Sequence, residues 1–319
     1  IGVNMPAKRK KKGEEAKIEK PPEKPWYKFW PPGVRKHIDY PEVPLFEILR
    51  DSARKYPDKT AIIYFDRKIT FRELDVLSDK FATALVDFGV KKGDKVAIFL
   101  PNIPQFVISY YGALKAGAIV TAISPLYKER EVEHQLNDSE AETIVVLDML
   151  YPIVEKVWEK TRLRNVIVAS LKDYMPAFKA FLGSLLKKIP THKVERKANV
   201  YFFTELMARY VAKPPTVEIN PREDLAALQY TGGTTGISKG AMLTHMNLVS
   251  NAVMCKEWLQ ANEAEEVVLT VLPLFHIYGM TTSMNAPIFF AGTMVMLPRF
   301  DAAAVLEAIQ KYKVTVFCG

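Results

Sequence analysis

The sequence predicts an α/β protein in which parallel sheets are covered by helices, wound twice in succession along the chain. Short apolar, β-branched segments recur from residue 60 onward at intervals of about two dozen residues. Helical patterns separate them, so we expect right-handed crossovers between parallel strands. The series pauses at Pro214 and Pro215 and then restarts. This restart predicts a boundary between two windings.

The first winding is expected between residues 60 and 170. A helix begins after Thr70, which we expect to form a capping box with Glu73, and it ends at Gly89. Pro104 opens the next helix and Gly117 ends it. The expected strands are "TAIIYF" (60–65), "KVAIFL" (95–100), "AIVTAI" (118–123), "ETIVVL" (142–147) and "NVIVAS" (165–170).

The second winding follows Pro215. Helices are expected over residues 245–259 and after Asp301, which caps "AAAVLEAIQKY". The expected strands are "DLAALQY" (224–230), "EVVLTVL" (266–272), "GTMVML" (292–297) and "KVTVFC" (313–318). The chain stops at Gly319, at the carboxyl end of a parallel strand, where open α/β sheets place their ligand sites. We therefore expect the natural polypeptide to continue.

Composition excludes several classes of protein. The net charge is +8, and residues 1–24 hold eight Lys/Arg against four Glu with too few apolar residues to fold. We interpret "KRKKK" as part of a solvated tail, so no nucleic-acid partner is expected. Two cysteines without metal-ligand spacing indicate a reducing compartment, the cytoplasm. Proline and glycine interrupt the apolar run 267–298, which favours buried core over a membrane helix.

The segment "YTGGTTGISKG" (230–240) directly follows a predicted strand. Glycines let backbone N–H groups approach an anion, because no Cβ intervenes. The threonines add hydroxyls for phosphate oxygens or Mg²⁺, and Lys239 adds a cation for a polyphosphate. A P-loop requires G-x-x-x-x-G-K-[ST], but Ser238 precedes and Gly240 follows the lysine. The segment predicts a phosphate-binding loop of another kind.

This segment resembles the phosphate loop of the AMP-forming adenylating enzymes, usually written [YF]-T-S-G-T-T-G-x-P-K-G. "ITFRELD", "LKAGAIVTAISPLY" and "LPLFHIYG" match further family motifs in the right order, so the resemblance runs from about residue 41 to residue 319. Gly232 replaces the usual serine and Ser238 the usual proline. The resemblance implies two flavodoxin-like windings, part of the large N-terminal domain of the acyl-CoA synthetase fold.

Segments 25–49 and 171–206 are similar to long- and medium-chain fatty-acid–CoA ligases. The resemblance therefore implies activation of a fatty acid with ATP and Mg²⁺ to an acyl-adenylate, followed by transfer to CoA. Another adenylating enzyme, either an aryl-acid–CoA ligase or a carrier-loading domain, stays open as an alternative. A non-catalytic fragment that binds a membrane or a partner is the other alternative, and a homodimer is also considered.

The resemblance assigns site residues. Thr231 is placed near Mg²⁺ and the terminal phosphates, and His276 beside the acyl carboxylate and the thiol path, as an orienting residue. The residues that would surround the triphosphate are Thr231, Gly232, Gly233, Thr234, Thr235, Gly236 and Lys239. Tyr278, Gly279 and Met280 would begin the acyl pocket. We expect His245 to start a helix, and His37, His134 and His192 to be surface groups.

The expected division is a basic tail and entry segment (1–40), a first subdomain (41–215) with a basic amphipathic insertion (171–199), and a second subdomain (216–319). By resemblance, the adenine-, ribose- and adenylation-lysine motifs and a C-terminal domain lie beyond residue 319, so this fragment alone is expected to be inactive. Residues 171–189 place apolar side chains at helical spacing among lysines. They predict either a helix packed on the core or one at the inner face of an anionic membrane.

Overall fold

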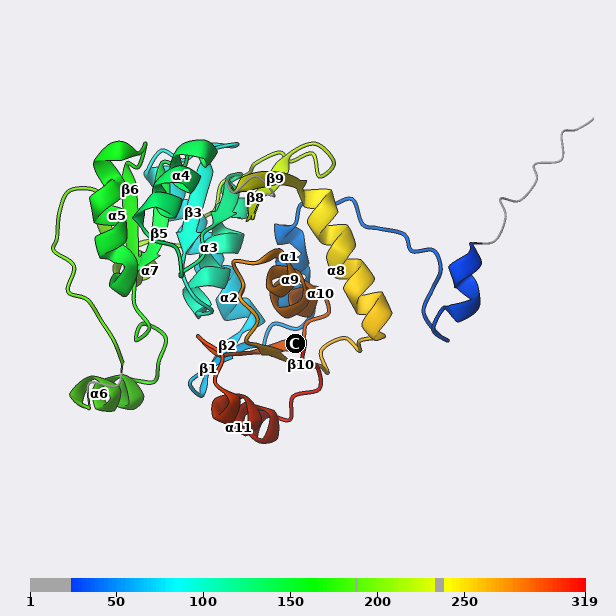
Figure 1. Cartoon of the computed structure of the whole chain (residues 1–319). Coiled ribbons are helices and arrows are strands. Elements are labelled where there is room, and N and C mark those ends of the chain that lie inside the picture. Colours follow the sequence, from blue (N-terminus) through cyan, green and yellow to red (C-terminus); the bar gives the residue numbers. More distant parts are fainter. Residues whose placement is uncertain (1–23, 187–188, 233–237) are drawn as a thin grey trace, which may run out of the picture. The chain divides into compact units, whose positions relative to one another are not determined.

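The computed structural model describes residues 24–186, 189–232 and 238–319 (Figure 1). It has two compact units, one ending at His37 and one running from Ile38 to Gly319. In the first unit the 3₁₀ helix η1 (Pro25–Phe29) precedes Trp30, whose Nε1–H donates to the Val34 carbonyl at 2.9 Å. Residues 1–23, most of the predicted basic tail, lie outside the described residues. Every element below belongs to the second unit.

The larger sheet has the strand order β7-β6-β5-β3-β4-β8-β9. Neighbouring strands are parallel except β8 and β9, which are antiparallel. Its strands are β3 (Lys95–Phe99), β4 (Ile119–Ala122), β5 (Thr143–Leu147), β6 (Asn165–Ala169), β7 (Val200–Phe202), β8 (Leu225–Thr231) and β9 (Lys239–Thr244). The predicted parallel α/β architecture is confirmed.

The smaller sheet has the order β10-β11-β1-β2. Its strands are β1 (Thr60–Tyr64), β2 (Arg67–Thr70), β10 (Val267–Thr270) and β11 (Thr293–Met296). β1 pairs in parallel with β11, and β8 and β9 extend the larger sheet. The boundary predicted at residue 215 therefore does not separate the sheets. Apolar patterning identifies a strand, but it does not say which segment supplies its hydrogen bonds.

Helices lie between the sheets and on both outer faces. Ile62 of β1 and Ile98 of β3 share one buried cluster with α1, α2 and α3. The outer face of the larger sheet packs on α4 and α5, and that of the smaller sheet on α11. The helices are α1 (Phe46–Lys55), α2 (Phe71–Asp87), α3 (Pro104–Lys115), α4 (Glu129–Ser139), η2 (Asp148–Leu150), α5 (Tyr151–Val157), η3 (Trp158–Lys160), α6 (Ala177–Leu185), α7 (Phe203–Arg209), α8 (His245–Leu259), α9 (Ile277–Met280), the π-helical η4 (Thr281–Asn285), α10 (Ala286–Phe289) and α11 (Ala302–Tyr312).

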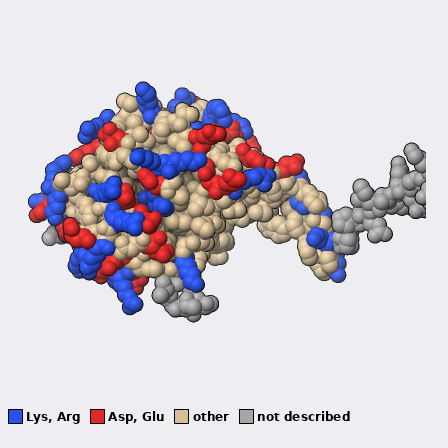
Figure 2. All heavy atoms as spheres, turned by 90° about the horizontal axis from the view of Figure 1, so that it is seen from above, with Lys and Arg blue, Asp and Glu red and all other residues tan. Residues whose placement is uncertain are grey.

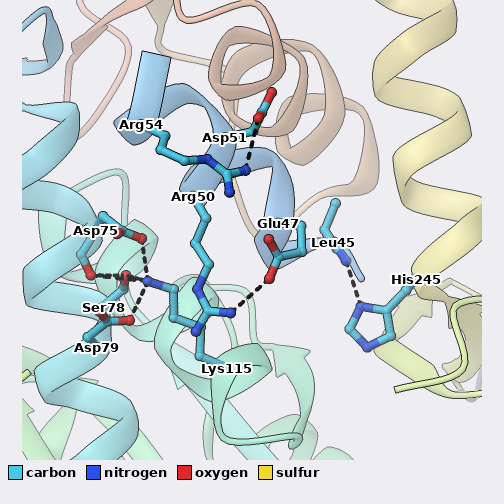
Figure 3. A network of polar contacts seen from close by, with 10 residues as sticks. All are labelled: Leu45, Glu47, Arg50, Asp51, Arg54, Asp75, Ser78, Asp79, Lys115 and His245. Atoms are coloured by element: carbon cyan, nitrogen blue, oxygen red, sulfur yellow. Dashed lines mark hydrogen bonds and ion pairs between the residues drawn. The ribbon is translucent and has the colours of Figure 1, made fainter. Parts of the chain in front are cut away.

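A buried ion network joins two of the central helices. Lys115, the last residue of α3, is fully buried, and its Nζ donates to Asp75 Oδ1 at 2.5 Å and to Asp79 Oδ1 at 2.6 Å on α2 (Figure 3). Ser78 Oγ accepts a further hydrogen bond at 2.8 Å. Burial raises the pKa of the Asp79 carboxyl, and the neighbouring ammonium opposes that rise. The network fixes α3 against α2.

The strand predictions need correction at four places. β2, β7 and β9 were not predicted, and residues 239–244 of β9 lack the β-branched pattern of a buried strand. The strand expected at 313–318 does not form, and Val316 makes only an isolated parallel bridge with Val268. There the Val267 N–H donates to Thr315 Oγ1 at 2.9 Å instead of to a backbone carbonyl. A side chain thus replaces part of the ladder.

The capping box predicted at the start of α2 is only half present. Thr70 Oγ1 accepts from the Glu73 N–H at 3.1 Å, as expected. The Glu73 carboxylate accepts from Arg67 at 3.1 Å instead of reaching back to the helix start. Arg67 lies in β2, and a nearby guanidinium is a stronger donor than a backbone N–H. The ion pair therefore draws the glutamate away from the cap.

The helix of the basic insertion turns its apolar side away from the protein. Ala180 and Ile189 pack against the core, and Lys179 pairs with Asp66 in the β1–β2 turn. The opposite side of α6 exposes Phe178, Phe181, Leu182 and Leu185, at 73%, 67%, 39% and 66% of their surfaces. Figure 1 shows α6 at the end of a long excursion from β6. These exposures do not fit the alternative of a helix whose apolar side packs on the core.

Charges of both signs lie on the surface, and the long apolar run is mostly buried. On the face seen in Figure 2, basic and acidic side chains are interspersed. The apolar run 267–298 forms β10, α9, η4, α10 and β11, and most of its residues are buried, as predicted. Across the described ranges, the helices are all too short or too polar to cross a bilayer.

Candidate functional site

The glycine-rich segment joins two antiparallel strands. β8 ends at Thr231 and β9 begins at Lys239, and these two residues are register partners. Directly opposed residues in an antiparallel pair share a face, so the hydroxyl and the ammonium lie on the same side of the hairpin. Both residues are exposed, as is Gly232. The predicted site residues Gly233, Thr234, Thr235 and Gly236 lie outside the described residues.

His276 lies at the start of α9, after β10. Its Nδ1 accepts from the Tyr278 N–H at 3.3 Å, which caps the short helix. In the neutral ring the proton is then on Nε2, because Nδ1 is the acceptor. The imidazole is exposed, so its Nε2–H can donate to a ligand.

One pocket of about 320 Å³ connects the hairpin with this histidine. Thr231, Gly232 and His276 line it together, although His276 is more than forty residues from the other two in sequence. Gln229 of β8 donates from Nε2 to the Phe275 carbonyl at 2.9 Å, so the strand and the histidine loop are directly joined. The remaining walls come from the β4–α4 connection and from α4. The pocket lies at the carboxyl edge of the larger sheet, as expected for a ligand site in this architecture.

The three residues expected to begin the acyl pocket differ in exposure. Tyr278 is exposed, whereas Gly279 and Met280 are buried. A Cβ on Gly279 would lie 2.4 Å from the Pro273 carbonyl oxygen, so this close backbone approach requires glycine. A second, largely apolar pocket of about 370 Å³ is lined instead by side chains that include Leu126, Phe275 and Phe300.

A Mg²⁺ role for Thr231 depends on what else would hold the ion. Within the described ranges there is no cluster of three or more His, Cys, Asp or Glu residues suited to a metal. Mg²⁺ usually keeps several waters and binds through few protein ligands plus substrate phosphates. One threonine hydroxyl beside a polyphosphate fits that pattern, but it does not fit a resident metal centre.

The other histidines divide into structural and surface groups. His245 begins α8, as predicted, and its buried Nδ1 accepts from the Leu45 N–H at 3.0 Å (Figure 3). Desolvation lowers the pKa of His245 to about 4. His37 and His192 are exposed, in agreement with the prediction. His134 is not a simple surface group, because it is half-buried and contacts the backbone at Ser238. No sequence motif marked it.

Comparisons with known proteins give the family of the chain and its relatives. The family described as "AMP-binding enzyme" matches residues 49–319. A long-chain-fatty-acid–CoA ligase of Bacillus subtilis is 42% identical over 302 residues, which cover 93% of this chain and 54% of that protein. The crystal structure of a long-chain-fatty-acid–CoA ligase from Archaeoglobus fulgidus matches with a TM-score of 0.73 and 31% identity, covering 88% of this chain and 52% of that one.

An anthranilate–CoA ligase solved with anthranoyl-AMP matches with a TM-score of 0.71 at 22% identity, covering 87% of this chain and 49% of that one, a likeness of fold alone. The chain spans about half the length of the curated relatives it matches.

Proposed function

Because the chain belongs to the AMP-binding enzyme family, we propose that the protein activates a fatty acid with ATP and transfers the acyl group to CoA. The observation that carries this proposal is the shared pocket of Thr231 and His276, with Lys239 paired to Thr231 across the hairpin. A polyphosphate and a carboxylate would meet there. The 42% identity to a long-chain-fatty-acid–CoA ligase supports a fatty acid as the substrate.

In the first step a carboxylate oxygen attacks the α-phosphorus of ATP. The bond between the α-phosphorus and the bridging oxygen breaks, and pyrophosphate leaves with the electron pair. Such displacements depend mainly on positioning and on neutralising charge. The exposed Lys239 ammonium and the Thr231 hydroxyl lie on the hairpin where they would bind the departing pyrophosphate. Mg²⁺ on the phosphates, with Thr231 as one oxygen ligand, would supply further charge neutralisation.

His276 has an orienting role in this scheme. Its Nδ1 is occupied by the Tyr278 N–H, so Nε2–H is the donor available for an oxygen of the acid. In the second step the CoA thiolate sulfur attacks the acyl carbon, the thioester bond forms, and AMP leaves. The same Nε2–H would hold the carbonyl oxygen during both steps. Tyr278, Gly279 and Met280 follow it in the chain, and we propose that they form the entrance for the acyl chain.

The test is pyrophosphate release by the complete gene product. Saturated acids of eight to eighteen carbons, benzoate and anthranilate are each supplied with ATP and Mg²⁺, with and without CoA. We expect release that depends on the fatty acid, and acyl-CoA formation when CoA is present. Preference for an aryl acid would replace the fatty-acid proposal with the aryl-acid alternative. An anthranilate–CoA ligase is one of the structures of similar fold. Release with none of these acids would reject both.

We also propose that α6 binds the surface of an anionic membrane, where a fatty acid is available. Residues 171–199 hold seven Lys/Arg against two Asp/Glu, and the exposed side of α6 is made of phenylalanine and leucine. Basic residues beside an outward apolar face are the pattern of a helix that lies in the bilayer interface. Asp66 also accepts from Lys311 and Tyr312 of α11, so the Lys179 pair anchors α6 to the body of the protein.

Co-sedimentation with vesicles tests the membrane proposal independently of catalysis. Phe178→Glu/Phe181→Glu is compared with Val211→Glu/Leu306→Glu, which adds the same charge at two other exposed apolar side chains. We expect the wild type and the control pair to bind phosphatidylglycerol vesicles at low salt, and the α6 pair to stay in the supernatant. High salt should weaken binding, because exposed charges are screened beyond roughly 8–10 Å. Equal sedimentation of both pairs would contradict the proposal.

A further inference from the structure

Helix α4 contacts the hairpin of β8 and β9, here called the phosphate hairpin, next to the loop end of each strand. On the β9 side, His134 Nε2 lies 3.0 Å from the Ser238 carbonyl oxygen, one residue before Lys239. On the β8 side, the Tyr230 hydroxyl donates to the Asp138 carboxylate, one residue before Thr231. His134 and Asp138 are four residues apart in α4 and therefore share one helix face. A single helix face thus meets both strands next to the residues proposed to hold pyrophosphate.

The Tyr230 ring fills the space between α4 and β9. It packs edge-to-face with the His134 imidazole, with ring centroids 6.5 Å apart and planes at 89°. A Cβ at Gly240 would lie 3.0 Å from the ring, and Gly240 is the register partner of Tyr230. Glycine at 240 therefore lets the ring lie close to the hairpin backbone. The contact ties the imidazole, the phenol ring and the hairpin backbone into one packed group.

Helix α4 is itself held to the sheet beneath the hairpin. Gln135 is fully buried, and its Nε2 donates to Thr121 Oγ1 at 2.9 Å and to the Ala122 carbonyl at 3.0 Å. Both acceptors belong to β4, which pairs in parallel with β8. The contact between α4 and Ser238 therefore holds Ser238 in place relative to the sheet that contains Thr231.

We propose that His134 is a positioning residue for Lys239, acting through the Ser238 carbonyl. The proposal rests on the proposed function only in assuming that Lys239 binds the phosphates. A carbonyl oxygen can only accept, so Nε2 carries the proton, and both the neutral ring and the imidazolium can donate. Serine at 238 leaves the backbone free to rotate, whereas a proline would fix its φ without a partner. The family pattern quoted above has proline at this position, and the imidazole here supplies the restraint from outside the loop.

The experiment is a double-mutant cycle in the complete gene product, with His134→Phe and Ser238→Pro as the two changes. Phenylalanine keeps a ring against Tyr230 but lacks the donor. We expect His134→Phe to raise the KM for ATP by about three- to tenfold, the loss expected for one hydrogen bond. The kcat should change less than twofold. Ser238→Pro alone should have little effect, but in the His134→Phe background it should return KM to near the wild-type value. His134→Gln, which keeps a donor, should resemble the wild type, as should the control His192→Ala.

Amide hydrogen exchange at Lys239 and Gly240 provides a readout that needs no activity. We expect faster exchange in His134→Phe and recovery in the double variant. If KM and exchange are unchanged in His134→Phe, or if Ser238→Pro acts equally in both backgrounds, the imidazole does not position the hairpin. A lower melting temperature with unchanged KM would assign His134 a purely structural role and also overturn the proposal. If the wild type does not consume ATP, the proposed function fails, while the exchange comparison still decides the role of His134.

Discussion

Lys115→Met should destabilise the protein more than any change to a surface ion pair. The ammonium is fully buried and donates to two carboxylates on α2, whose side chains are only 23% and 18% exposed. Methionine fills similar volume but leaves both carboxylates without their cation. Removing one member of a buried ion network costs about 3–5 kcal/mol, a large part of a typical unfolding free energy of about 5–15 kcal/mol. Urea denaturation followed by circular dichroism measures the loss.

The deficit of Lys115→Met should also depend on pH. Burial already raises the folded-state pKa of Asp79, and loss of the opposing ammonium should raise it further. The folded variant then binds a proton before the unfolded chain does, so the deficit is complete at neutral pH and shrinks as pH falls through the raised pKa of Asp79. The control is Lys156→Met, which breaks the exposed pair with Glu129 and should cost less than about 1 kcal/mol. A loss below that value for Lys115→Met, or one that is constant between pH 7 and 4.5, would refute the reasoning.

Three further changes test other parts of the structure. The pKa of His245 is lowered from 6.5 to about 4, so the unfolded state binds the proton first as the pH falls. The free energy of unfolding should therefore decrease by about 2 kcal/mol between pH 7.5 and 5. Denaturation curves of His245→Asn should lack this decrease, and an equal decrease in the variant would assign it to other groups. Lys239→Ala removes a charge-assisted contact of about 1–3 kcal/mol and should raise the KM for ATP at least fivefold in steady-state kinetics, whereas an unchanged KM would remove Lys239 from the phosphate site. Gly279→Ala forces a Cβ to 2.4 Å from the Pro273 carbonyl and should lower the melting temperature by several degrees, which calorimetry would detect.

The candidate site shows how far short motifs lead and what they miss. The glycine segment and His276 were predicted as site residues because each belongs to a short motif that resembles the family pattern, and their roles stay predictions. His134 was assigned to the surface, since a lone histidine on a helix carries no local signal of the backbone it meets a hundred residues later. From the sequence alone, Lys115 is indistinguishable from an ordinary surface lysine at the C-terminal end of a helix. Only the packing of α2 against α3 places two carboxylates around it.

The sequence by itself determined most of the strands, the main helices and the place of the glycine-rich segment. Those features follow from hydrophobic period, capping residues and glycines, all of which act within a few residues of the chain. The tertiary structure alone decided that β1 joins β11 across more than two hundred residues, that β9 pairs with β8, and that α6 faces its apolar side outward. Pairing partners and exposed faces depend on which distant segments compete for the same surface. A local sequence pattern therefore does not predict the outcome of that competition.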